Sequence, residues 1–322
     1  MKDEGRKTGA RREVRGARYT DVRAPRAPRP APRARSSTGW LFVLPAFVHL
    51  CVFVLFPIVF ALILSFFRWD VLKPQKPFVG LHNYAVLFHD PLFWNALWNS
   101  TYYAIGSVPI GMAVALFVAI LAHQKLRGVQ LFRTIYYMPA VASSVATAMI
   151  WTFIYLPENG LLDWLLNAVG LKGAAQIDWL QSTVWAMPAL IFMSIWTGLG
   201  PRMVLFLAGL TSIPEPLYEA AAVDGAGRWA AFRHITLPML LPTTFFILVT
   251  SSISAFQVFT PVYMMTKGGP VRHTDVIGYH IYKVAWRQFH MGMASAESYL
   301  LFMVIFAVTL VQFKFVSARI DA

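Results

Sequence analysis

The stretch Glu219–Pro242, EAAAVDGAGRWAAFRHITLPMLLP, decides how this chain is organised. Its pattern predicts two short helices joined at Gly225, because glycine adopts the positive φ that ends a helix at little cost. Long apolar segments lie on both sides of the pair. We therefore expect a soluble element, residues 211–242, held between two membrane spans, where a partner that supplies energy can act on the chain.

The first helix of this pair is expected to start at Pro216, which suits the first helical position. Glu215 then lies at the positive end of the helix dipole. One face of this helix is apolar and rich in small residues, which allows close approach to a groove. That face consists of Leu217, Ala220, Ala221 and Val223.

The second helix is predicted over residues 228–235, with Trp229, Phe232 and Ile235 on one side. Pro238 and Pro242 are expected to end it and to lead into the next span. A short helix needs a surface on which to bury its apolar face. Lipid headgroups are one candidate surface and another protein is the other.

The composition places the chain in a membrane. Hydrophobic residues make up 57% of it and charged residues only 13%, about half the share that is usual for a soluble domain. The single cysteine, Cys51, lies in an apolar run, so no disulfide or zinc framework is expected. A soluble globular fold is therefore excluded.

The net charge of +13 comes largely from one end of the chain. Twelve of the 28 Lys and Arg residues precede Trp40, in a segment rich in Arg, Pro and Ala. Such a segment cannot bury apolar surface, so residues 1–38 are predicted to be a disordered cytoplasmic tail near anionic lipid. Residues 39–322 then form the membrane domain, and no nucleic-acid partner is expected.

Six segments are long and apolar enough to cross a bilayer, which needs roughly 20 residues per helix. Gly198, Gly200 and Pro201 are expected to interrupt the fourth. The apolar run after Gly39 is longer than the core of a signal peptide, so the first span is expected to be retained. The predicted spans are 40–67, 99–122, 132–156, 183–210, 243–265 and 297–316.

Basic residues set the expected orientation of these spans. With both termini in the cytoplasm, nineteen Lys and Arg residues lie on the inner side, twelve of them in the tail, and eight lie in outer loops. The element at 211–242 then faces the cytoplasm. We expect a multi-pass protein of a bacterial cell membrane.

The chain carries few groups for chemistry of its own. The sequence places no Asp or Glu in the middle of a predicted span, which disfavours an ion-coupled carrier. His49 is expected to pack or hydrogen-bond between helices. No GxxxxGK[ST] loop, metal-ligand spacing or nucleophile–base pair is present in the sequence, so neither ATP hydrolysis nor an enzymatic reaction is expected of this chain.

A second block of sequence completes the pattern. It runs from Phe256-Gln257-Val258-Phe259 through Thr266-Lys267-Gly268-Gly269-Pro270 to Gly292-Met293-Ala294. Together with Glu219-Ala220-Ala221, Asp224-Gly225-Ala226 and Leu237-Pro238, it resembles the carbohydrate permeases of ABC importers of the maltose and glycerol-phosphate type. The likeness covers Trp40 to the C-terminus. Two residues depart from this likeness. Relatives more often carry an acidic or amide residue at the position of Thr260 and a neutral residue at the position of Arg202.

This resemblance implies an all-α membrane protein with six transmembrane helices in a type I ABC importer permease bundle. It also implies three kinds of partner: a second permease subunit, a dimer of ABC ATPase subunits that binds the ATP, and an extracytoplasmic solute-binding protein. No cofactor is expected in this chain. The residues matching the loop on which the ATPase docks are Leu217, Glu219, Ala220, Ala221, Asp224, Gly225 and Ala226.

Polar groups on the fourth and fifth spans are candidates for the substrate cavity, because hydroxyl and amide groups can bind sugar hydroxyls. They are Ser194, Thr197, Ser251, Ser254 and Gln257. Packing of small polar residues between helices is an equal alternative for each. Trp196 or Phe256 could stack on a pyranose ring.

Three further alternatives stay open. Arg202 is expected to snorkel toward the cytoplasm rather than to meet an anionic substrate such as a glycerophosphodiester. The outer segment 276–289 is expected to lie along the membrane face. For the function, the alternatives to a sugar importer are a permease for glycerol-phosphate-type anionic solutes and an ion-coupled secondary carrier.

Overall fold

The computed structural model describes residues 36–124, 128–171 and 177–320. They belong to two units, which divide between Leu55 and Phe56. The predicted tail, residues 1–38, lies outside the described residues except for its last three, which belong to the first helix. Within the described ranges the chain contains helices and isolated bridges but no β-strand.

The first unit is described as one helical segment. It consists of α1 (Ser36–Leu50), which contains Pro45, and a π-helical turn, η1 (Cys51–Leu55). His49 is exposed, and its ring contacts that of Phe53 at 5.0 Å between centroids. Within the described part of this unit, His49 therefore contacts a residue of its own helical segment.

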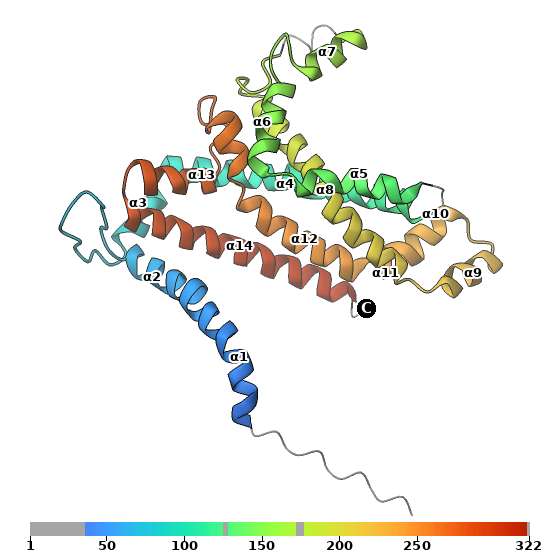
Figure 1. The fold of residues 1–322 in the computed structure, drawn as a ribbon, viewed down its shortest axis with the longest axis horizontal. Coiled ribbons are helices and arrows are strands. Elements are labelled where there is room, and N and C mark those ends of the chain that lie inside the picture. Colours follow the sequence, from blue (N-terminus) through green and yellow to red (C-terminus); the bar gives the residue numbers. More distant parts are fainter. Residues whose placement is uncertain (1–35, 125–127, 172–176, 321–322) are drawn as a thin grey trace, which may run out of the picture. The chain divides into compact units, whose positions relative to one another are not determined.

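The second unit holds the remaining helices, shown in Figure 1. They are α2 (Phe56–Ser65), α3 (His82–His89), α4 (Pro91–His123), α5 (Val129–Val141), α6 (Ser144–Ile154), α7 (Leu161–Ala168), α8 (Ala186–Thr211), α9 (Glu215–Val223), α10 (Arg228–Ala231), α11 (Leu237–Met239), α12 (Leu241–Phe256), α13 (Ile277–Tyr282) and α14 (Met291–Ile320). Three π-helical turns join some of these helices: η3 (Phe232–Thr236), η4 (Val262–Thr266) and η5 (Lys283–Arg287).

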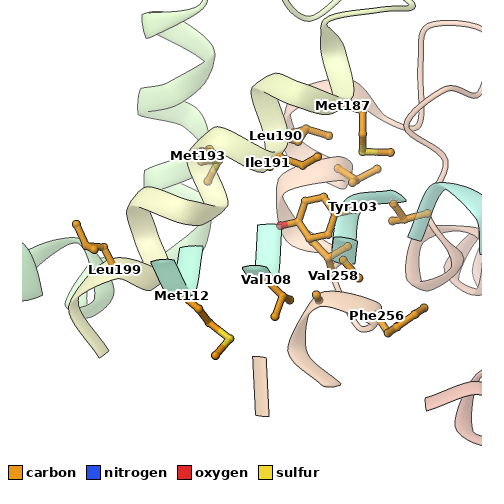
Figure 2. Packing of buried hydrophobic residues seen from close by; sticks show 14 of the residues in the cluster. Tyr103, Val108, Met112, Met187, Leu190, Ile191, Met193, Leu199, Phe256 and Val258 are labelled. Atoms are coloured by element: carbon orange, nitrogen blue, oxygen red, sulfur yellow. The ribbon is translucent and has the colours of Figure 1, made fainter. Parts of the chain in front are cut away.

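The core of this unit lies where α4 packs along α8 and α12. Figure 2 shows Tyr103, Val108 and Met112 of α4 beside Leu190 and Met193 of α8. Small residues let these backbones approach closely, as is usual between helices in lipid. Ala115 and Ala119 of α4 are fully buried. A Cβ on Gly209 of α8 would lie 2.7 Å from Thr243 Oγ1 of α12.

Four helical segments are long and apolar enough to cross a membrane, and there are six if each of two bent helix pairs is one span, counting only residues that the structure describes. The four are Trp40–Ser65, Pro91–His123, Ala186–Thr211 and Met291–Lys314. The pairs are Gln130–Val141 with Ser144–Ile154, and Arg228–Met239 with Leu241–Phe256. The six-span expectation thus agrees with the fold once the bends are included.

Two of the predicted spans are not straight helices. The predicted span 132–156 bends by 100° between α5 and α6, because Ala142 and Ser143 have extended backbones. The predicted span 243–265 ends as a helix at Phe256. A new helical turn begins beside Pro261, which lacks the N–H needed to continue the earlier ladder.

The expected interruption of the fourth span is wrong. Helix α8 continues through Gly198, Gly200 and Pro201. A Cβ on Gly200 would lie 2.6 Å from Tyr136 O and 2.7 Å from Tyr137 Cα, so this glycine lets the backbone of α5 touch α8. Gly200 therefore provides a contact surface between helices rather than a break.

Candidate functional site

The candidate site is the hairpin formed by α9, α10, η3 and α11, which we call the α9–α11 hairpin (Glu215–Met239). Its first arm, α9, begins at Glu215 with Pro216 in the first turn, as the sequence predicts. Its second arm leads directly into α12, and its first arm follows α8 after a short turn. The hairpin is thus attached at both ends to helices of the core.

The turn between the two arms has a defined geometry. Gly225 has φ +76°, which confirms the expected helix-ending conformation. The Gly225 N–H donates to Ala222 O at 3.1 Å, and the Ala226 N–H donates to Ala221 O at 2.8 Å. These two bonds form a Schellman motif, in which a residue with positive φ ends the helix. The relative direction of the arms is therefore fixed by backbone hydrogen bonds.

The second arm is longer than predicted. It continues from Arg228 to Met239 through the π-helical turn η3, so Pro238 does not end it. Pro238 instead lies in the first turn of α11, where its missing N–H costs little. The Trp229 and Phe232 rings contact each other at 5.5 Å, and Ile235 packs against the core. The expected apolar side of this arm is thus present.

One hydrogen bond ties the two arms together. The Tyr218 hydroxyl of α9 lies 2.9 Å from Thr236 Oγ1 of η3, and Thr236 is buried. Beside this contact, a cleft of about 800 Å³ separates the hairpin from the ends of α4 and α8. Residues lining the cleft include Ile120, His123, Leu210, Glu215, Arg228 and Phe232.

The described residues cover the first arm only in part. None of the residues of α9, all of which the structure describes, is buried. Leu217 is 40% exposed and Val223 is 88% exposed. Glu219, Ala220, Asp224 and Gly225 are exposed, while Ala221 and Ala226 are half-buried. Most of the predicted docking residues are therefore exposed in the described chain.

The candidate cavity residues of α8 divide by their contacts. Thr197 Oγ1 donates to Met193 O of its own helix at 2.7 Å, so its hydroxyl is satisfied locally. Ser194 is half-buried on the same helix. Trp196 is 41% exposed and contacts the Trp151 ring edge-to-face at 5.5 Å, so it keeps an open surface.

The candidates on α12 divide in the same way. Ser251 is buried and its Oγ accepts from Arg202 Nε at 3.1 Å. Ser254 and Gln257 are exposed, although Ser254 Oγ also donates to Thr250 O at 2.9 Å. Phe256 is only 5% exposed, so it cannot stack on a sugar in this conformation. Ser194 and Ser251 thus face the core, while Ser254 and Gln257 face outward from this chain.

The direction of Arg202 differs from the expectation. Its guanidinium lies against Gly198, one turn closer to the N-terminal end of α8, and against Gly111 of α4. The side chain therefore does not extend toward the C-terminal end of α8, the end toward which snorkelling is expected. Helical side chains tilt toward the helix N-terminus, and the two glycines leave the space that the guanidinium fills.

The second sequence block forms a buried loop between η4 and α14. Its Gly268 has φ +80°, and Thr274 Oγ1 donates to Thr266 Oγ1 at 2.7 Å. Asn99 Nδ2 of α4 donates to the carbonyl oxygens of Arg272 and Asp275 at 2.8 and 3.1 Å. These bonds fasten the loop to the core of the membrane domain.

Residues 276–289, expected along the membrane face, are buried at their start and open toward their end. Val276 and Ile277 are fully buried and Tyr279 is 1% exposed, so α13 belongs to the core. Only Trp286, with 62% exposure, has the open surface expected of an interfacial anchor. The aromatic residues pack against one another through Phe259, Tyr263, Tyr279 and Tyr282.

A charged cluster in this loop was missed by sequence reasoning. Lys283 Nζ is paired with Asp275 Oδ2, and His280 lies 3.5 Å from Asp275 Oδ2 and 3.7 Å from Glu297 Oε1. Burial raises the pKa of Asp275, but hydrogen bonds from His280 and Lys283 outweigh it and leave that pKa below its usual value. The sequence does place His280 and Lys283 three residues apart, on one face of a helix, and this spacing could have indicated the cluster.

Known proteins resemble this chain over most of its length. A family model described as "Binding-protein-dependent transport system inner membrane component" matches residues 107–321. The "Probable ABC transporter permease protein YurN" of Bacillus subtilis (strain 168) is 39% identical over 278 residues, covering 86% of this chain and 94% of that protein. The "Lactose transport system permease protein LacF" of Rhizobium radiobacter is 36% identical over 281 residues, 85% of this chain and 92% of its own.

A solved structure shares the fold. A chain of a bacterial ABC transporter involved in the import of the acidic polysaccharide alginate superposes with a TM-score of 0.77 at 24% identity, covering 88% of this chain and 96% of that one. The helical fold of this chain is thus shared with a transporter subunit, and the sequence comparisons match the chain to a family of transport proteins. The chain therefore belongs to the family of inner membrane components of binding-protein-dependent transport systems.

Proposed function

We propose that this chain is the permease subunit of an ATP-driven importer for a sugar or oligosaccharide. It acts with a second permease subunit, a dimer of ATPase subunits that binds the ATP, and an extracytoplasmic solute-binding protein. The family supports a binding-protein partner, and the name of the relative LacF supports a carbohydrate solute.

One observation carries the proposal: a rigid, uncovered helix is attached to the core. Helix α9 and the turn that follows it hold the seven candidate coupling residues, Leu217, Glu219, Ala220, Ala221, Asp224, Gly225 and Ala226. A nine-residue helix is marginal in water by itself, so an exposed one that keeps a fixed direction suits a partner groove. We assign that groove to the ATPase.

The attachment of the hairpin indicates how work reaches the cavity. When nucleotide closes the ATPase dimer, the hairpin moves as a rigid body and displaces α8 and α12, to which it is joined. The core then opens alternately to each side of the membrane. Solute shifts this equilibrium only through its different affinity for the two states.

The polar groups of α8 and α12 supply the proposed contacts with the sugar. Ser254 and Gln257 are exposed on this chain, so the second permease subunit or the solute can cover them. Ser194, Thr197 and Ser251 lie deeper and are proposed to line the inner part of the path. With the hairpin in contact with a cytoplasmic ATPase, both chain termini lie on the cytoplasmic side.

The hairpin assignment is tested with two glycines that are two residues apart. Gly225 needs positive φ, whereas Gly227 has φ −72°, and a Cβ at either position meets nothing within 4 Å. We expect Gly225→Val to abolish solute uptake and solute-stimulated ATPase activity in proteoliposomes, and Gly227→Val to retain both. A strained backbone of this kind costs about 1–3 kcal/mol, enough to redirect α9.

Charge reversal on the exposed arm gives an independent test. We expect Glu219→Lys to insert normally but to lose copurification with the ATPase subunits, while Glu219→Gln loses less. Uptake at the wild-type level in both Gly225→Val and Glu219→Lys would contradict the assignment. Uptake driven by an ion gradient in liposomes containing this chain alone would contradict the importer itself.

A further inference from the structure

The guanidinium of Arg202 lies inside the membrane domain. Helix α8 runs from Ala186 to Thr211, so its midpoint falls between Gly198 and Leu199. At 1.5 Å per residue, Arg202 is about 5 Å along the axis from that midpoint. Because the side chain turns back toward Gly198, its charge lies even closer to the middle of the span.

Three helices enclose this charge. A Cβ on Gly111 of α4 would lie 2.3 Å from Arg202 Nη1, and a Cβ on Gly198 of α8 would lie 2.9 Å from it. From α12, Ser251 Oγ accepts a hydrogen bond from Arg202 Nε at 3.1 Å. Two missing side chains and one hydroxyl therefore make a place for a guanidinium and fix its orientation.

The charge has no counter-ion in the part of the chain that the structure describes. No carboxylate there lies within 4.0 Å of Arg202, and Nη1 is buried without a hydrogen-bond partner among the described residues. An unpaired positive charge at this depth is costly, and arginines at such depth ordinarily pair with an anion or face a water-filled path. Arg202 is half-buried, so the junction is not fully sealed.

We propose that Arg202 is a specificity-determining residue that pairs with an anionic group of the transported solute. This inference rests on the proposed function and deepens it: the solute is a sugar that carries a carboxylate or a phosphate. Both groups accept two parallel hydrogen bonds from the planar guanidinium fork, which a neutral sugar cannot replace. Ser251 holds Nε, and Nη1 is buried without a partner among the described residues, so the anion reaches it when alternating access opens the junction between α4, α8 and α12.

The test uses three solutes with one sugar scaffold: glucose, glucuronate and glucose 6-phosphate. Binding to the purified, nucleotide-free complete importer is measured by isothermal titration calorimetry, without the binding protein, which has its own specificity. We expect the wild type to bind at least one charged sugar about tenfold or more tighter than glucose, and Arg202→Gln to reduce that ratio to near one. Comparing the two charged sugars distinguishes carboxylate from phosphate.

Two variants separate the role of Arg202 from a general loss of charge or structure. Lys314→Gln removes one positive charge at the exposed end of α14 and should leave the ratio unchanged. Arg202→Lys keeps the charge but not the fork and should give an intermediate ratio. If Arg202→Gln fails to assemble, Arg202→Lys and the salt dependence of binding to the wild type test the inference instead. About 0.5 M NaCl should weaken the binding of the charged sugars and leave the binding of glucose unchanged.

Three results would overturn the inference. The wild type could bind glucose as tightly as both charged sugars, or the ratio could be the same in Arg202→Gln. The two permease subunits of the Arg202→Gln variant could also separate on size-exclusion chromatography while the ratio of affinities for charged and neutral sugar stays unchanged. That result would show that the second subunit supplies the counter-ion of Arg202. Neutral-sugar uptake that is unaffected by Arg202→Gln would leave the importer assignment intact, whereas failure of the hairpin tests would remove the assignment itself.

Discussion

The α9–α11 hairpin and the loop between Lys267 and His290 both join spans of the same domain, yet they are built in opposite ways. Figure 1 shows α9 and α13 beyond opposite ends of α12. The hairpin exposes every residue of its first arm at least in part. The loop buries Val276 and Ile277 completely and contains the ion pair of Asp275 with Lys283.

The loop is held by contacts within the chain, whereas the hairpin leaves one arm largely exposed. Asn99 and Ser100 bond the backbone of the loop, and Thr274 bonds Thr266, so the loop is fastened by contacts within this subunit, although Asp275 Oδ1 is buried without a partner among the described residues. The hairpin satisfies its turn but leaves its alanine-rich surface open. An element that must be gripped by another protein needs that surface, whereas an element that holds spans together does not.

Replacing an aspartate in each region should give the largest contrast. Asp275→Asn leaves Lys283 without its anion beside a buried site and should lower the free energy of unfolding by about 3 kcal/mol. Asp224→Asn lies in the exposed turn of the hairpin and should leave the melting temperature unchanged. Thermal unfolding of the purified complex measures both. Equal melting temperatures for the two variants would contradict the division between the regions.

The pH dependence of stability should show that the carboxylate of Asp275 causes the difference between the two variants. The folded-state pKa of Asp275 lies below its ordinary value of 3.8, so its ionised form contributes stability above that value. This contribution is lost as the pH falls from 3.8 through the lower folded-state pKa. We expect the gap in melting temperature between wild type and Asp275→Asn to be constant near neutral pH and to shrink below about pH 4. A gap that persists undiminished in acid would exclude the carboxylate as its cause.

Two glycines make a comparison of intermediate size. A Cβ on Gly278 would lie 2.8 Å from Val258 O, so Gly278→Ala should overpack the loop and destabilise the domain by about 1–3 kcal/mol. Gly225 lies in open space with positive φ, so Gly225→Ala should strain only the turn. We expect Gly278→Ala to lower the melting temperature and Gly225→Ala to lower solute-stimulated ATPase activity instead. The reverse pattern would show that the hairpin stabilises the fold.

Local signals explain what the sequence could predict. Pro216 and Gly225 mark the ends of α9 through constraints that belong to single residues, so the first arm was predicted almost to the residue. Six spans followed from hydropathy, because the bilayer fixes the length of an apolar helix. Both predictions depend on properties of a short window of sequence.

Long-range contacts explain what the sequence could not predict. The bend at Ala142–Ser143 and the junction of His280 with Glu297 depend on neighbours far away in the chain. The glycines of α8 predict a break because a lone sequence does not show that α5 touches Gly200. The direction of Arg202 was partly predictable, since a glycine four residues earlier on the same helix face leaves space for it.

The smallest expected effect comes from the single bond that joins the two arms of the hairpin. Tyr218→Phe removes the contact with Thr236 Oγ1, a bond worth about 1 kcal/mol, and should reduce solute-stimulated ATPase activity severalfold at an unchanged melting temperature. Thr274→Val removes a comparable hydroxyl from the buried loop and should lower the melting temperature while coupling per folded complex is retained. Because both changes delete one hydroxyl, only location separates them. If both variants altered the same observable, the hairpin and the loop would not be distinct mechanical parts.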